Sequence, residues 1–168
     1  MKHELDIYMR ARYPLLWVVT PEEVRALDEI DSLAREHRKR VLVWTNTTGI
    51  MNTAIPGKGD LSKRDPLGVL NAVIEDTEPT IWVLCDFHPY LKDAAVVRRL
   101  RETAGALKPT HKTVILLGSV LRIPPELEKD VTVVDFALPG APQITQMLDR
   151  ICAEISRSGR IEVTLDKR

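Results

Sequence analysis

Polar side chains that could do chemistry follow the apolar run 81–85 of this 168-residue sequence. Asp86 comes directly after the run, where nucleotide hydrolases hold a magnesium-binding aspartate. His88 lies two residues further on and could join Asp86 as a metal ligand. Two candidate ligands are fewer than the three that a catalytic zinc site uses, so we predict no metal site. The plainer interpretation of Asp86 is a residue that caps the next turn or forms an ion pair across the strand ends.

Ser119 offers a second chemistry, because it follows the apolar run 112–117. With His88 as base and Asp86 or Asp135 as orienting acid, it could act as a nucleophile. However, Gly118-Ser119-Val120 lacks the G-x-S-x-G turn that exposes the serine of an α/β-hydrolase. A turn serine that bonds its own backbone is the competing interpretation, so no catalytic residue is assigned.

Phosphate binding is the third chemistry to consider. Lys58, within Gly57-Lys58-Gly59-Asp60, looks like a fragment of a phosphate loop, but the segment does not link a strand directly to a helix, which favours a flexible loop. The patterns G-x-x-x-x-G-K-[ST] and G-x-G-x-x-G are absent. The turn Thr20-Pro21-Glu22-Glu23 has a proline without an N–H and two carboxylates where a phosphate would sit. We therefore predict no nucleotide cofactor for this chain.

Apolar runs that alternate with helical patterns must position these residues. Five short runs with little polar alternation predict buried strands. Because helices separate them, the fold class is α/β, a three-layer α/β/α sandwich with a five-stranded parallel sheet. Ligands of such sheets bind beyond the carboxyl ends of the strands, where Asp86, His88 and Ser119 fall. The five predicted strands are residues 15–20, 40–45, 80–86, 112–117 and 131–136.

Helix signals place the remaining segments. Thr20 is expected as the N-cap of one helix, with Pro21 in its first turn. Asp65-Pro66 predicts the start of another helix, and the segment 45–63 before it is expected to be a loop. The last helix has the clearest apolar stripe, from Ile144 to Ile155. Residues 1–160 are predicted to form one domain, with 161–168 as a tail or the start of a linker.

Composition excludes several classes of protein and of partner. The sequence has 24 basic residues (Lys plus Arg) and 24 acidic residues (Asp plus Glu). This balance argues against binding of nucleic acid or anionic lipid through the net charge of the whole protein. No apolar run approaches the roughly 18 residues of a membrane span, and the two cysteines make no disulfide scaffold. A cytoplasmic protein without membrane association is expected. The basic clusters 37–40 and 98–101 are solvated faces or a patch for nucleic acid or an acidic partner; aromatic residues, at 5%, disfavour nucleic acid.

Several segments together resemble the N-terminal domain of a known AAA+ ATPase family. They are Ala11-Arg12-Tyr13-Pro14, Thr20-Pro21-Glu22-Glu23, Leu84-Cys85-Asp86-Phe87-His88, Pro124-Pro125-Glu126-Leu127 and Asp135-Phe136-Ala137-Leu138-Pro139. The family occurs in bacteria, cyanobacteria and plastids and was long labelled by an uncharacterised plastid (ycf-type) reading frame. The resemblance implies an AAA-type sheet with strand order 5-1-4-3-2. It also implies that ATP and magnesium belong to a following AAA module rather than to this chain.

Comparison with active AAA modules implies lost catalytic parts. Asp86 stands at the magnesium position, but Phe87 replaces the glutamate that polarises water. Ser119 stands near the sensor position, and residues 20–23 replace the phosphate loop. Gly49-Ile50-Met51 resembles a vestige of a pore loop. These departures predict a non-catalytic AAA+-like domain, without Walker A, that acts in protein interaction, assembly or regulation.

The expected partner is an AAA+ module, in cis or in trans, or a second copy of the chain. The alternative is a small ligand- or nucleotide-binding regulatory domain, or a hydrolase, at the carboxyl edge of the sheet. Under that alternative, the weak binding signals at Lys58, Asp86, His88 and Ser119 would become the site.

Overall fold

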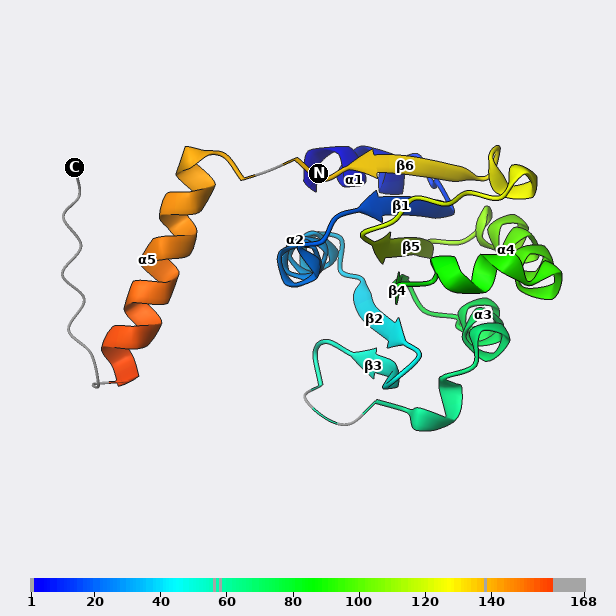
Figure 1. Cartoon of the computed structure of the whole chain (residues 1–168), viewed down its shortest axis with the longest axis horizontal. Helices are drawn as coiled ribbons and strands as arrows, with labels where there is room; N and C mark the ends of the chain where they lie inside the picture. Colours follow the sequence, from blue (N-terminus) through cyan, green and yellow to red (C-terminus); the bar gives the residue numbers. More distant parts are fainter. Residues whose placement is uncertain (1, 56, 58, 138, 159–168) are drawn as a thin grey trace. The chain divides into compact units, whose positions relative to one another are not determined.

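The computed structural model describes residues 2–55, 57, 59–137 and 139–158, and Figure 1 shows their elements. Helices separate most of the strands along the chain, as predicted. The strands are β1 (Leu15–Val19), β2 (Arg40–Thr45), β3 (Gly49–Asn52), β4 (Thr80–Cys85), β5 (Thr113–Gly118) and β6 (Val131–Asp135). The α-helices are α1 (Lys2–Arg10), α2 (Glu23–Glu36), α3 (Pro66–Glu75), α4 (Ala94–Leu107) and α5 (Ala141–Ser158). Short 3-10 helices are η1 (Leu61–Lys63), η2 (His88–Lys92) and η3 (Pro125–Leu127). None of the described helices combines the length and hydrophobicity that crossing a membrane requires.

The α/β class is confirmed, but the five-stranded parallel sheet is wrong. Within the described residues the sheet has six strands in the order β3-β2-β4-β5-β1-β6. β3 pairs with β2 in antiparallel fashion, whereas the other neighbouring strands pair in parallel. The sheet is therefore mixed. The expected five-strand order 5-1-4-3-2 must be corrected, because β3 is an additional strand at one edge.

β3 arises inside the segment 45–63, which was expected to be a loop. Thr45 pairs with Gly49, so the chain turns back immediately after β2. Gly49 has a φ of 69°, and a Cβ there would overlap the carbonyl oxygen of Asp60. Only glycine fits such a close approach of two backbones. Gly49, Ile50 and Met51 thus form an edge strand instead of the loop implied by the resemblance.

Two apolar layers hold the first 136 residues together. Alternate residues of β1 point to opposite faces of the sheet: Leu15 and Trp17 to one, Leu16 and Val18 to the other. α3 and α4 cover the first face, whereas α1 and α2 cover the second (Figure 1). Burial on both faces explains why the strands are nearly continuous apolar runs.

The helix starts were predicted with mixed success. Asp65 is the N-cap of α3: its Oδ2 accepts a hydrogen bond from the backbone N–H of Gly68 at 2.6 Å, and Pro66 is in the first turn. Thr20 is not an N-cap, because α2 begins at Glu23 and Glu22 holds the cap position. Instead, Thr20 Oγ1 accepts a hydrogen bond from the backbone N–H of Glu22 at 3.0 Å.

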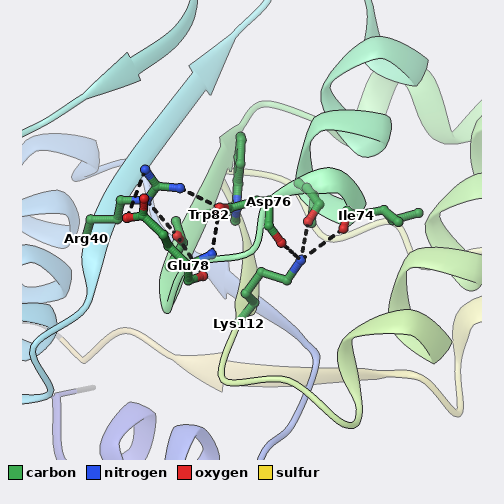
Figure 2. Close-up of polar contacts among 8 residues, drawn as sticks. Arg40, Ile74, Asp76, Glu78, Trp82 and Lys112 are labelled. Carbon is green, nitrogen blue, oxygen red and sulfur yellow. Dashed lines mark hydrogen bonds and ion pairs between the residues drawn. The ribbon is translucent and has the colours of Figure 1, made fainter.

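A polar network ties together the ends at which β2, β4 and β5 begin (Figure 2). Lys112, only 7% exposed, donates from Nζ to the carbonyl oxygens of Val73 at 2.7 Å and Ile74 at 3.2 Å, and also to that of Asp76. The Asp76 carboxylate accepts from Arg40 and, at 3.0 Å, from Trp82 Nε1. Lys112 therefore satisfies carbonyls at the end of α3 that have no partner within the helix.

α5 belongs to a second compact unit that begins at Ala137, whereas residues 1–136 form the first. α5 carries the predicted apolar stripe, but the side chains of the stripe are exposed. Ile144, Met147, Leu148 and Ile151 are each between 44% and 48% exposed. The proposed tail, residues 161–168, lies outside the described residues, and the predicted boundary at residue 160 stays a prediction.

Candidate functional site

The carboxyl edge of the sheet carries the residues that the sequence singled out. Asp86 follows β4 and Ser119 follows β5, and these strands are neighbours with Cys85 paired to Leu117. His88 begins η2, two residues beyond Asp86. The edge thus brings the three residues to adjacent strand ends, but no hydrogen bond joins any two of them in the described structure. Asp135, at the end of β6, is separated from β5 by β1. Lys58 lies outside the described residues.

Asp86 is held close to the end of β5. Its backbone N–H donates to the carbonyl of Leu117 at 2.8 Å, and its φ is 49°, in the left-handed region. A Cβ on Gly118 would lie 3.0 Å from Asp86 Oδ1, so glycine leaves room for this carboxylate. The side chain is exposed and makes no hydrogen bond or ion pair within the described residues. The predicted capping or ion-pair role of Asp86 is therefore not seen there.

The space beside His88 is too narrow for a ligand. His88, Gly118 and Val120 line it together with buried Trp17 and Phe87, and it does not admit a water molecule. Among the described residues, no group of three or more His, Cys, Asp or Glu side chains is arranged to hold a metal ion. Ser119 is exposed. Within the described residues, Ser119 and His88 therefore do not form an assembled nucleophile and base.

The first βα turn uses its own backbone donors. The N–H of Thr20 donates to Gly118 O at 2.9 Å, Pro21 has no N–H, and that of Glu22 donates to Thr20 Oγ1. A phosphate loop instead presents successive free N–H groups to its ligand. The Glu22 carboxylate forms no cap hydrogen bond and pairs with Arg25, contrary to our expectation that it faces the helix N-terminus. Glu23 remains as the acidic residue of the first turn.

Negative charge surrounds the end of β4. The pKa of the Cys85 thiol is raised to about 12, mainly by burial and also by the nearby carboxylates of Glu23 and Asp86. Cys85 is 4% exposed, so it is a protonated core residue at neutral pH. The same two carboxylates would repel a phosphate group at this edge.

The two basic clusters behave differently. Arg98 and Arg99 both bond Glu102, at 2.8 and 3.2 Å, which makes that cluster a paired helix face. In the other cluster His37 bonds Asp6 and Arg40 bonds Asp76. His37, Arg38 and Lys39 line a cavity together with Arg12, a residue that was not among those singled out from the sequence. A basic residue directly after a helix end was the signal that could have identified Arg12.

Comparisons with known proteins agree with this architecture. Proteins described as "Uncharacterized AAA domain-containing protein ycf46" are 33% identical over 155 residues in Trieres chinensis and 32% identical over 151 residues in Guillardia theta. Each alignment covers 88% of this chain, and the chain spans only 30% and 29% of those two relatives.

Solved structures show the same fold at low sequence identity. A RuvB variant from Thermotoga maritima aligns with a TM-score of 0.55 and 12% identity, covering 92% of this chain and 50% of that one. A chain of the E. coli MS115-1 HORMA:CdnC:Trip13 complex aligns with a TM-score of 0.51 and 13% identity, covering 83% and 49%. These likenesses show that the chain shares the α/β fold of those two structures.

The family profile described as "SpoVK-like AAA ATPase, N-terminal domain" matches residues 1–136, the same residues that form the first compact unit. The resemblance noted in the sequence is thereby confirmed: this chain belongs to the SpoVK-like AAA ATPase N-terminal domain family.

Proposed function

We propose that this chain is a non-catalytic AAA+-like domain that acts in the assembly or regulation of an AAA+ ATPase. The first βα turn carries the proposal. Its donors at Thr20 and Glu22 are used within the protein, and Pro21 has none. Glu23 and Asp86 add negative charge beside it. An ATP phosphate would therefore meet neither a backbone cradle nor a positive field.

The partner in this proposal is the AAA module of a ycf46-type protein. The curated relatives are named for an AAA domain, and they extend well beyond the 30% that this chain matches. The exposed apolar stripe of α5 supports a protein partner, because contiguous apolar side chains at helical spacing gain free energy when a second surface covers them. A hydrolase or ligand-binding role has no comparable support, since the space beside His88 admits no water.

Thermal shift with nucleotides tests the non-catalytic part. A ligand at about 100 times its dissociation constant adds roughly 2.7 kcal/mol of stability. We expect no magnesium-dependent shift with ATP, ADP or GTP. A magnesium-dependent shift that Asp86→Asn removes would overturn the proposal, because it would place the nucleotide at the carboxyl edge.

Association with the AAA module tests the interaction part. The purified module of a ycf46-type relative is titrated with this chain, and complex formation is followed by sedimentation velocity. Ile151→Asp is expected to weaken the complex at least tenfold. Ala153→Asp is the matched control, because it adds the same charge on the opposite side of α5 at another exposed position. Equal weakening by both variants, or no complex with the unaltered chain, contradicts the proposed partner; self-association without the module would favour a second copy instead.

A further inference from the structure

A basic cavity of about 460 Å³ opens at the other edge of the sheet, where the strands begin. The ends of α1 and α2 and the loops before β4 and β5 form its walls. Six of its eight lining residues carry cationic or imidazole side chains: Arg10, Arg12, His37, Arg38, Lys39 and His111. Three separate segments of the chain supply these six residues, so the concentration of charge is a product of the fold.

The helix α1 ends at this cavity in a Schellman motif. The N–H of Tyr13 donates to Tyr8 O at 3.0 Å, and the N–H of Arg12 donates to Met9 O at 3.2 Å. Arg12 has a φ of 58°. This is the left-handed position at which glycine is the usual residue, because a side chain there crowds the backbone.

The helix α2 ends at the same cavity in the same motif. The N–H of Lys39 donates to Ala34 O at 2.9 Å, and the N–H of Arg38 donates to Arg35 O at 3.2 Å. Arg38 has a φ of 54°. Among the described residues only one other non-glycine residue, Asp86, has a positive φ. Two arginines thus hold glycine positions and meet at one cavity, which local stability does not explain.

Three cations of the cavity, those of Arg12, Arg38 and Lys39, are available to a ligand, whereas Arg10 and His37 both bond the carboxylate of Asp6. The helix-end carbonyls are already satisfied by backbone N–H groups, and in the described structure the side chains of Arg12, Arg38 and Lys39 form no ion pair or hydrogen bond. The nearby acids are engaged: Asp6 accepts from His37 at 2.6 Å, and Glu78 pairs with Arg40 at 3.2 Å. Burial lowers the pKa of the Lys39 ammonium, because this cation is half-withdrawn from water without a counter-charge.

We propose that this cavity binds a compact ligand that carries two or more phosphate groups. Guanidinium groups match phosphate oxygens in a two-bond geometry, and Arg12 and Arg38 supply two of them from different helices. The volume lies in the range of small-molecule sites. A nucleic-acid strand fits less well, because none of the described residues that line the cavity is a Phe, Tyr or Trp on which bases could stack.

Calorimetric titration of the 168-residue chain with tripolyphosphate at physiological ionic strength tests the proposal. We expect saturable binding to one site, weakened at least tenfold by Arg12→Gly and by Arg38→Gly. Arg122→Gly, which removes one exposed positive charge beyond β5, and Asp86→Asn, at the carboxyl edge, are expected to bind as the unaltered chain does. ATP titrated in parallel distinguishes the source of the phosphates: tighter binding than tripolyphosphate indicates a nucleotide, and equal binding a free polyphosphate.

The glycine variants remove the charge without straining the backbone, so lost binding cannot be attributed to unfolding; their melting temperatures are measured as a check. Absence of tripolyphosphate binding overturns the proposal, as does equal binding by both glycine variants and the unaltered chain. Binding of a single-stranded oligonucleotide without binding of tripolyphosphate also overturns it, in favour of a nucleic-acid surface. Because Asp86→Asn is included, failure here is distinguishable from failure of the proposed non-catalytic role.

Discussion

Arg12 and Arg38 occupy the same position of the same helix-ending motif, one after α1 and the other after α2, and both line one cavity. Their φ angles of 58° and 54° fall in the region that favours glycine. The two helices lie on the same face of the sheet, so their ends and these two side chains converge. Backbone strain at two positions that line one cavity is typical of a functional site.

Replacing either arginine by glycine should stabilise the protein. A residue with a Cβ in the left-handed region destabilises the folded state by about 1 kcal/mol. Glycine removes this strain, but its greater backbone freedom also stabilises the unfolded chain, so the net gain in stability is smaller. We expect Arg12→Gly and Arg38→Gly each to raise the free energy of unfolding by up to ~1 kcal/mol in urea titrations. Arg122→Gly serves as the control and should not stabilise. A loss of more than about 1 kcal/mol in either variant would show that the arginine side chain has a structural role.

Lys112→Met should destabilise the protein by about 2–3 kcal/mol, because it leaves buried carbonyls at the end of α3 without a donor. Burial lowers the pKa of the Lys112 ammonium, and the nearby Asp76 carboxylate opposes this shift. Lys108→Met, at an exposed position, is the control and should change stability by less than about 0.5 kcal/mol. Urea unfolding of both variants measures the difference. An equal loss of stability in both variants would mean that water replaces Lys112 as the hydrogen-bond donor to these carbonyls.

Gly49→Ala should destabilise the protein by about 2 kcal/mol or more. The added Cβ would overlap the Asp60 carbonyl, and the positive φ disfavours alanine as well. Gly57→Ala is the matched control, because nothing lies within 4 Å of a Cβ there. Hydrogen exchange should show faster exchange of amides in β2 and β3 for Gly49→Ala only. Unchanged exchange would indicate that the β2–β3 pairing does not depend on Gly49.

Stability should fall as the pH rises above about 9, in part because of Cys85. Burial raises the pKa of its thiol to about 12, so the folded protein keeps a proton that the unfolded chain loses near pH 9. The folded state then binds more protons than the unfolded state, and each pH unit between 9 and 12 costs roughly 1.4 kcal/mol. Cys85→Ala removes this contribution while creating a small cavity. Its unfolding free energy should therefore start lower near neutral pH but decline less steeply; parallel declines would contradict the assignment.

Local signals in the sequence determined much of the fold. Unbroken β-branched runs predicted the five parallel strands, because a strand buried on both faces has no polar alternation. Asp65-Pro66 located the start of α3 correctly, since an N-cap bonds a neighbour three residues away and needs no distant partner. The segments around Asp86 and the turn at residue 20 also identified the family, which the comparisons confirmed.

Other features depended on contacts between distant residues, which only the tertiary structure decided. β3 forms because the backbone of Gly49 packs closely against that of Asp60. The hydrophobic pattern of the segment 45–63 does not predict this contact.

The basic cavity shows most clearly which features local sequence determined and which depended on tertiary packing. The sequence alone shows arginine at position 12 and a basic run at 37–40, each ordinary at a helix end. Their convergence exists because α1 and α2 pack on one face of the sheet and end at the same edge. Residue types and helix ends were therefore determined by local sequence, whereas the site that they form was determined by long-range packing.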